Sequence, residues 1–493
     1  MPEYIESVRV LLPILTTLIA PYFIWRFRDN EDLREGASFI AGLLTFAGVI
    51  SLAPAVLDGK VWTYTPFVIY PGISIKFVAD GLSMVFAIVA SFLWMFATFY
   101  NIGYMRGLKE HAQTRYYFCF AVAIFGAVGV AFAGNVLTLY LFYEVISIFT
   151  YPLVAHHEDD EAFEGARKYF VYLMGSSKLF LLPAMILTYV LCGTLDFHIG
   201  DLARGMFPPS ADPTLVSITY GLYIFGLAKA AIMPLHNWLP SAMVAPTPVS
   251  ALLHAVAVVK AGVFSVCRVM LSVFGVDLLD KLFLGIPTAY LAAFTILVAS
   301  IIALTKDDLK ARLAYSTVSQ LSYVIIGVAL LTPMAVRGGM VHIAHHAFSK
   351  ITLFFAAGAI YVAAHEKKIS RMGGLGRKMP FTFGAFGLAA LSMIGVPPVC
   401  GFVSKWYIVN GALQAGQFAL LIALLGSTLL NAGYFTPILY TAFFKPAHPD
   451  VDHTHIQEAP LTMVIPLFLT ALISVFLGLY PETFLQFINV FAK

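Results

Sequence analysis

The residues in this sequence with the clearest capacity for chemistry are basic side chains inside long apolar segments. Lys229, His236, His254 and Lys260 all fall within residues 226–268, which are otherwise mostly apolar. Ionisable side chains at membrane depth are costly, and they mark ion or proton pathways by default. An alternative stays open for Lys229 and Lys260, because a lysine can extend its ammonium group to the lipid headgroups with no further role.

Prolines interrupt the same stretch. Pro234, Pro240, Pro246 and Pro248 each remove a backbone N–H group, so the segment must break or kink repeatedly. Inside a membrane such backbone survives only where protein buries it or where it lines a wet cavity. Broken backbone and buried charge together predict the centre of a translocation site.

A second stretch shows the same combination. In residues 391–409, Pro397, Pro398 and Gly401 interrupt an apolar segment, and Lys405 follows four residues after the glycine. Counting predicted spans, these are the seventh and the twelfth, five apart. The correspondence indicates two pseudo-symmetric half-channels.

Between them, one apolar segment carries His342, His346 and Lys350 at positions i, i+4 and i+8, which places them on one helical face. Histidine binds and releases protons near neutrality, so the row is typical of a proton relay. Inert packing is the alternative. A metal site would need further ligands, and no carboxylate or cysteine occurs at a suitable spacing.

Glu144 is the single acidic or basic residue between Arg115 and His156. A carboxylate this deep has to be protonated or paired. Lys229 and Lys260 are the candidate partners, and a purely structural ion pair is the alternative.

Two further charged residues are weaker candidates. Asp80 opens an apolar segment, where capping of the helix N-terminus is the favoured interpretation. Lys178 lies inside another span, and the pairs Ser177-Lys178 and Tyr189-Val190 match Ser349-Lys350 and Tyr361-Val362 at the same offset. The matching spans are five apart, and an odd number inverts the copy, as in transporters built from inverted repeats.

The elements that must hold these residues are membrane helices. The chain has 493 residues, of which 60% are hydrophobic and 12% charged, and this excludes an ordinary soluble protein. Segments of about 20 apolar residues predict transmembrane helices. We expect about 14 such helices in a single membrane domain, over residues 7–25, 38–57, 81–104, 115–133, 135–155, 166–192, 214–235, 248–274, 283–304, 312–331, 337–363, 383–412, 416–444 and 460–486.

Loop charges predict the orientation. Loops after odd-numbered spans, such as residues 26–37 and 367–378, are rich in lysine and arginine, whereas loops after even-numbered spans hold few. Positively charged loops stay in the cytoplasm. We therefore expect a multi-pass protein of the cell's inner (cytoplasmic) membrane with both termini on the outer, periplasmic side.

The sequence predicts no catalytic site, cofactor or resident metal. The cysteines Cys119, Cys192, Cys267 and Cys400 lie in different spans without metal-binding spacing, and no nucleotide loop or nucleophile–base motif is present. His453 and His455 could bind a metal adventitiously. The expected partners are membrane lipids, other membrane subunits and the transported ions, with no nucleic acid.

Several runs resemble one known family, the antiporter-type subunits shared by Mrp cation/proton antiporters, respiratory complex I (chains L, M and N) and membrane-bound hydrogenases. The similar runs span roughly residues 75–445. They are GNVLTLYLFYEV, LAKAAIMPLHNWLPSAMVAPTPVSALLHAVAVVKAGV, LKARLAYSTVSQLSYV, HAFSKITLFFAAG and GVPPVCGFVSKW.

The resemblance implies fourteen helices, two inverted five-helix repeats and broken seventh and twelfth helices. It divides the single domain 1–493 into three N-terminal helices (1–114), a first repeat of helices 4–8 (115–275), a second repeat of helices 9–13 (283–444) and a last helix (460–493). It also implies proton-translocation roles for Glu144, Lys229, His254, Lys260, His342, His346, Lys350 and Lys405.

Departures from the family pattern concern which of the family's chains this one resembles. Ser241 stands where an aspartate is common, and Lys178 matches no usual position. Lysine at position 405 is unlike chain M and closer to chain L or the Mrp subunits, but the chain has no long lateral helix of the chain L kind.

Two functions of different class follow. The first is proton translocation through two half-channels, in an Mrp-type cation/proton antiporter or, alternatively, a redox-driven pump. The exchanged cation (sodium, potassium or none beyond protons) is left open. The second is a structural membrane anchor without transport, but retention of every ionisable family position favours transport.

Overall fold

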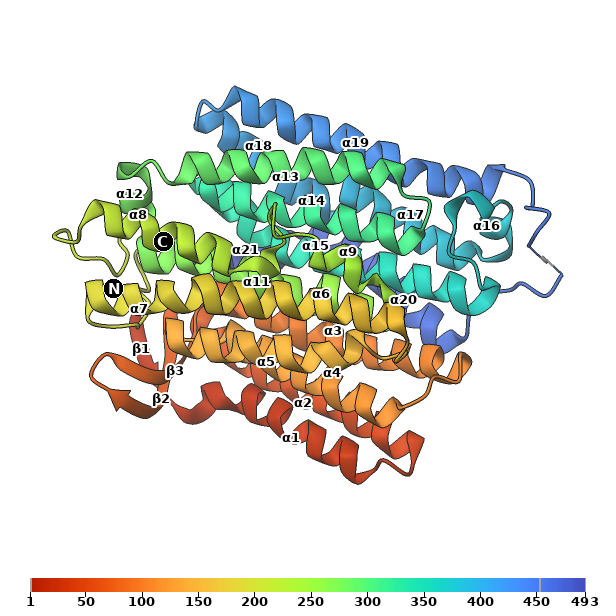
Figure 1. Ribbon diagram of the computed structural model, residues 1–493, viewed down its shortest axis with the longest axis horizontal. Helices are drawn as coiled ribbons and strands as arrows, with labels where there is room; N and C mark the ends of the chain where they lie inside the picture. Colours follow the sequence, from red (N-terminus) through yellow and green to blue (C-terminus); the bar gives the residue numbers. More distant parts are fainter. Residues whose placement is uncertain (1, 452–453, 493) are drawn as a thin grey trace.

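The computed structural model describes residues 2–451 and 454–492, so the predicted metal ligand His453 lies outside it. In the described part, the chain folds into one bundle of helices that run roughly side by side (Figure 1). Eleven of the described helices are long and apolar enough to cross a membrane. The predicted polytopic helical membrane fold is confirmed.

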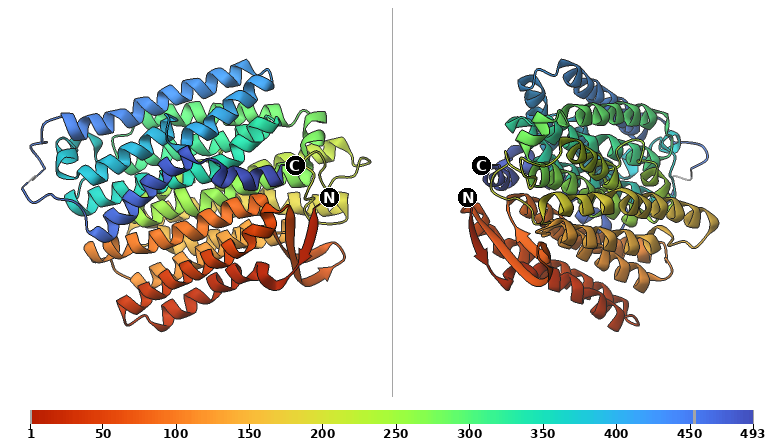
Figure 2. Two further views of the ribbon diagram at one scale, coloured as in Figure 1. Left: turned by 180° about the vertical axis from the view of Figure 1, so that it is seen from behind. Right: turned by 60° about the vertical axis from the view of Figure 1, so that its left-hand side comes forward.

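One feature departs from the all-helical expectation. A sheet of three strands, β1 (Glu3–Glu6), β2 (Lys60–Tyr70) and β3 (Ile73–Ala79), has the order β1-β2-β3, in which β2 is parallel to β1 and antiparallel to β3. Strands β2 and β3 are rich in β-branched and aromatic residues, which favour strands. The sheet lies at the end of the bundle where α21 (Glu482–Phe491) ends (Figure 2).

The first part of the chain forms helices that match the predicted spans closely. These are α1 (Leu12–Arg26), α2 (Glu31–Leu57), α3 (Gly81–Gly107), α4 (Gln113–Ala131), α5 (Val136–Val154), α6 (Asp160–Ser176) and α7 (Leu182–Cys192). Polar caps fix several starts: the side chains of Asp80 and Asn135 accept from the backbone N–H of Ser83 and Thr138. The prediction that Asp80 caps its helix is confirmed.

The seventh predicted span is broken, as expected. Helix α8 (Pro213–Gly226) gives way to a 3-10 turn (Ala228–Ala230) and the short α9 (Trp238–Ser241). Pro246 and Pro248, however, lie at the start of α10 (Thr247–Ala251). They begin a helix here instead of interrupting one, because the first helical positions need no N–H donor.

The eighth span is one continuous helical segment, Thr247–Phe274, that lies wholly inside the bundle. It consists of α10, a π-helical turn (Leu252–Val256), α11 (Val258–Arg268) and a second π turn (Val269–Phe274). The helix of residues 160–192 likewise contains a π turn (Ser177–Leu181). Such turns are frequent at functional sites.

The second part of the chain repeats the pattern of long helices and one break. Its helices are α12 (Val276–Lys281), α13 (Gly285–Thr305), α14 (Leu309–Ala329), α15 (Pro333–Ala364), α16 (Leu375–Lys378), α17 (Pro380–Ile394), α18 (Cys400–Gln414), α19 (Phe418–Phe444) and α20 (Leu461–Leu479). The break at Pro397-Pro398 separates α17 from α18, as predicted. The last predicted span, 460–486, was wrong in its length, because Pro481 separates α20 from α21.

Helix α15 lies at the centre of this second part, where it packs against α14, α17, α18, α20 and α3. All of its residues from Gly338 to Ile360 are buried. Any polar side chain in that stretch must therefore find its partners inside the protein.

A buried ion pair joins the N-terminal helices to the eighth span. Arg268 Nη1 and Nη2 donate to the two carboxylate oxygens of Asp80 at 2.6 and 2.8 Å, and Nη2 also donates to Ser83 Oγ at 3.1 Å. Both side chains are almost wholly buried. The sequence analysis assigned no role to Arg268.

We expect Arg268→Gln to lower the stability of the folded chain by about 3–5 kcal/mol, because it leaves the Asp80 carboxylate buried without its counter-charge. The measurement is the melting temperature of the purified chain in detergent. Arg204→Gln is the matched control, since Arg204 is an exposed arginine at the same end of the bundle. Equal melting temperatures for the two variants would contradict the structural weight given to the pair.

Candidate functional site

The first predicted lysine lies in the break of the seventh span. Lys229 occupies the 3-10 turn and is fully buried. Its Nζ donates to the Tyr143 carbonyl oxygen at 2.9 Å and to Ser147 Oγ at 2.7 Å, and it lies 3.3 Å from the centre of the Tyr143 ring. The Lys229 ammonium is thus held by one face of α5, through neutral oxygens and an aromatic ring.

Glu144 has a different partner from the one the sequence suggested. Its Oε2 accepts from Lys178 Nζ at 2.9 Å, and Lys178 also donates to Tyr140 Oη at 2.7 Å. Glu144 is one residue from Tyr143, or about 100° around α5, so its carboxylate turns away from Lys229. The expected pairing of Glu144 with Lys229 or Lys260 was wrong for this conformation, and the unplaced Lys178 supplies the cation.

The eighth span contributes two buried groups. Lys260 Nζ is in direct contact with His346 Nδ1 of α15. His254 lies in the π turn, with its ring 4.7 Å from the ring of Phe354 and neither ring nitrogen hydrogen-bonded to the described protein. The structure therefore joins two helices predicted separately to carry the relay.

The α15 row is buried in the protein interior, as its inward-facing pattern predicted. The rings of His342 and His346 are 5.9 Å apart, and His342 Nδ1 lies 2.8 Å from Ser404 Oγ of α18. Lys350 points to α14, where Nζ donates to Ser316 Oγ at 2.5 Å and to the Leu313 carbonyl oxygen at 3.2 Å.

Lys405 lies at the second helix break. Its Nζ donates to the carbonyl oxygens of Met393 and Ile394 at 2.5 and 3.1 Å, the last residues of α17, and is 4.6 Å from the Tyr323 ring. A helix C-terminus offers unpaired carbonyl oxygens and the negative end of the helix dipole, and both favour a cation. Lys405 is almost fully buried, which excludes a headgroup contact along this path.

Two predicted residues lie outside this row. His236 is half-buried beside the seventh-span break, and its ring lies 6.5 Å from that of Tyr315. Asp80 is paired with Arg268 at the sheet end of the bundle. Conversely, the sequence analysis missed His345, a fully buried α15 residue whose ring nitrogens have no hydrogen-bond partner among the described residues.

A cavity of about 710 Å³ opens at the end of the bundle away from the sheet. Its lining includes Glu110, Lys310 and Thr247, the first residue of the buried eighth span. Lys310 Nζ donates to the Ala245 carbonyl oxygen at 2.5 Å. Burial raises the pKa of Glu110, but the nearby His156 and His157 outweigh it and lower that pKa to about 2. Sequence reasoning missed this cavity, because its lining comes from loops far apart in the chain.

These features define a class: a multi-pass helical membrane protein with a buried row of lysines and histidines. The family model for the membrane part of NADH:quinone oxidoreductases and Mrp antiporters matches residues 133–431. The chain belongs to this family, as the resemblance of its sequence runs implied.

Known proteins of both kinds are similar to it. "NADH-quinone oxidoreductase subunit N" of Desulforudis audaxviator is 31% identical, over 98% of this chain and 97% of that protein. "NADH-quinone oxidoreductase subunit L" of Mycobacterium tuberculosis is 33% identical over 90% and 68%. A probable K(+)/H(+) antiporter subunit of Rhizobium meliloti is 30% identical over 97% and 48%.

Two solved structures share the fold. A chain of the Mrp complex from Dietzia superposes with a TM-score of 0.85 at 22% identity, over 99% of this chain and 97% of that one. A chain of an archaeal membrane-bound sulfane sulfur reductase has the same TM-score and coverage at 26% identity. The chain is an antiporter-type membrane subunit, and its partners are the other membrane subunits of a multi-subunit complex.

A close backbone contact holds the first break in place. A Cβ atom added at Gly262 of α11 would lie 2.3 Å from the Lys229 carbonyl carbon and the Ala230 nitrogen. At the second break, a Cβ at Gly401 would lie 1.8 Å from the Ser392 carbonyl oxygen. In both places glycine lets one helix approach the backbone of the broken segment.

We expect Gly262→Ala to displace the turn that carries Lys229 and to cost about 1–3 kcal/mol of stability. Gly221→Ala on α8 is the matched control, because nothing lies within 4 Å of the added methyl group. Alanine there should be neutral or stabilise the helix by up to about 1 kcal/mol. Melting temperatures in detergent compare the two, and an unchanged value for Gly262→Ala would show that the contact yields without cost.

Proposed function

We propose that this chain translocates protons across the membrane through the buried row of lysines and histidines. The observation that carries the proposal is the contact between Lys260 and His346, which joins the eighth span to α15 in the protein interior. From His346 the row continues to His342 and Ser404, the neighbour of Lys405.

The partners of these lysines suit proton exchange. Within residues 2–451 and 454–492, Lys229, Lys260, Lys350 and Lys405 donate to carbonyl or hydroxyl oxygens or contact an imidazole, and none forms an ion pair with a carboxylate. A proton can therefore move from one of them to a neighbour without the breaking of a salt bridge. Water that enters the broken segments would supply the remaining links.

The cavity at the end away from the sheet supports an entry route. It reaches Thr247, and His254 and Lys260 follow on the same buried helical segment. Lys405, at the second break, is the proposed exit. The two breaks, each with one lysine held by backbone carbonyl oxygens, support two half-channels related by inverted repeats.

Glu144 and Lys178 would regulate the first half-channel. Glu144 follows Tyr143, whose carbonyl oxygen holds Lys229, so rotation of its side chain could exchange Lys178 for Lys229 as partner. Such a switch would change the charge around Lys229 without any change in the helix.

Orientation follows from the ends of the bundle. The lysine- and arginine-rich loops after α1, α3 and α15 lie at the end away from the sheet, whereas β1 and α21 lie at the sheet end (Figure 1). By the positive-inside rule, the cavity would face the cytoplasm and both chain ends the outer side of the inner membrane.

For the complex, we propose first an Mrp-type cation/proton antiporter, in which protons move in exchange for sodium or potassium. The lysine at position 405 and the similarity to a probable K(+)/H(+) antiporter subunit support it. The second candidate is a redox-driven proton pump, and full-length similarity to subunit N of an NADH-quinone oxidoreductase favours it. In either complex, any redox catalysis would belong to other subunits.

We expect Lys260→Met to reduce proton-coupled transport at least about tenfold, because methionine keeps the apolar stem but cannot carry a proton to His346. The measurement is proton movement into vesicles that contain the assembled complex. Lys281→Met is the control, since Lys281 is exposed at the end of α12. Normal transport by an assembled Lys260→Met complex would favour a structural anchor instead.

A separate experiment distinguishes the two complexes. Gentle purification of the native complex and mass spectrometry of its subunits should yield small membrane proteins without iron–sulfur, flavin or nickel subunits if the complex is an antiporter. Copurification of such a redox subunit, together with a vesicle pH gradient that forms on addition of electron donor, would support the redox-driven pump and contradict the first candidate.

A further inference from the structure

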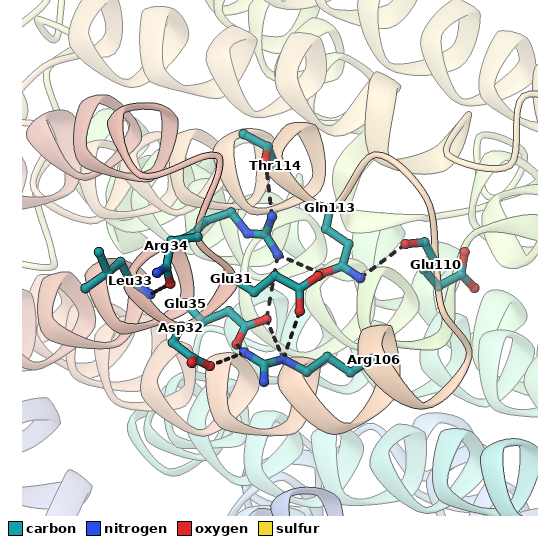
Figure 3. Close-up of polar contacts among 10 residues, drawn as sticks. Glu31, Asp32, Leu33, Arg34, Glu35, Arg106, Glu110, Gln113 and Thr114 are labelled. Atoms are coloured by element: carbon teal, nitrogen blue, oxygen red, sulfur yellow. Dashed lines mark hydrogen bonds and ion pairs between the residues drawn. The ribbon is translucent and has the colours of Figure 1, made fainter.

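Loop residues at the end of the bundle away from the sheet bring three metal-binding side chains together. Glu110 and His111 follow α3, and His156 follows α5. Figure 3 shows how the first loop is anchored: Gln113 Nε2 donates to the Glu110 carbonyl oxygen at 3.2 Å, and Arg34 donates to Gln113 Oε1 at 2.7 Å. The Glu110 carboxylate points away from this network (Figure 3).

The carboxylate lies among imidazole rings. Glu110 Oε2 is 3.6 Å from His156 Nε2, and Oε1 is 3.6 Å from His157 Nε2. The rings of His111 and His156 are stacked, with centroids 4.8 Å apart. One ligand atom from each of Glu110, His111 and His156 lies within 4.8 Å of the other two.

His156 is the group that the protein fold leaves unexplained. Its side chain is fully buried, yet neither ring nitrogen has a hydrogen-bond partner in the described structure. The 3.6 Å separation from Glu110 is too long for a hydrogen bond. Buried polar groups normally have a partner, so an unmet lone pair on His156, aimed at a carboxylate, points to a ligand between them.

We propose that Glu110, His111 and His156 form a binding site for one divalent transition-metal ion of the zinc class. Around such an ion, with bonds of about 2.0–2.2 Å, ligand atoms lie about 3.3–4.3 Å apart. The Glu110–His156 separation already falls in this range, and rotation of the exposed His111 ring closes the rest.

The donor set selects the metal. Two imidazole nitrogens and one carboxylate suit zinc, nickel or copper, whereas magnesium and calcium prefer oxygen ligands alone. The nearby cation Arg115 opposes a bound metal ion, but Arg115 is in contact with Glu158 and this carboxylate offsets its charge. His157, on the other oxygen of Glu110, holds the carboxylate in position.

This site goes beyond both the expectation from the sequence and the proposed function. The sequence analysis expected no metal, because it sought ligands on single helices and among cysteines. Its test is also independent of transport. Glu110 and His157 line the open cavity, so the ion would lie beside that cavity and not within the buried row.

The test is a titration of the full chain, purified without a polyhistidine tag and treated with a chelator, with Zn²⁺ in a calorimeter. We expect one Zn²⁺ per chain at this site, with Mg²⁺ unable to compete. His111→Ala and Glu110→Gln should each weaken Zn²⁺ binding by at least about tenfold. Because His111 is exposed, its variant should fold normally.

His365→Ala and His455→Ala are the matched controls. His365 is exposed and lines the same cavity, and His455 belongs to the other histidine-bearing loop. Both should bind Zn²⁺ as the unaltered chain does. Binding that His455→Ala removes and His111→Ala leaves intact would overturn the proposal, as would the absence of Zn²⁺ binding by the unaltered chain.

Discussion

The structure depends on one constraint: ammonium groups buried in a membrane protein must be given electron-rich partners without water. Burial of an unsatisfied charge costs more than a fold of this size can tolerate. Three of the four buried lysines in the row solve this in the same way. Lys229, Lys350 and Lys405 each donate to a backbone carbonyl oxygen, supplemented by a serine hydroxyl or a second carbonyl.

The helix breaks follow from this need. A regular helix uses its carbonyl oxygens internally, so free carbonyls occur mainly at helix ends. Lys405 uses those at the end of α17, and the break before α18 creates that end within the membrane. Lys229 is itself placed on a break, where the irregular turn directs its side chain to α5. Glycines 262 and 401 then let neighbouring helices close around the broken backbone.

Lys260 is the exception, and it makes the row continuous. Its partner is the His346 imidazole, so two titratable groups share one contact where the other lysines meet neutral oxygens. This contact links the first part of the chain to α15, the central helix of the second. A protein that needed only rigid anchoring would gain more stability from apolar packing at this position than from two polar groups.

The sequence determined the membrane class, nearly all of the helices, both breaks and the identity of the buried basic residues. It could do so because hydrophobic length, proline and buried charge act locally along the chain. Which charge meets which was decided only by the tertiary structure. The π turn at 177–181 and the one-residue step from Tyr143 to Glu144 direct Glu144 to Lys178, and no spacing rule reveals that. The same holds for Asp80 with Arg268 and for Glu110, His111 and His156, because each set joins segments far apart in the chain whose proximity depends on how the helices pack.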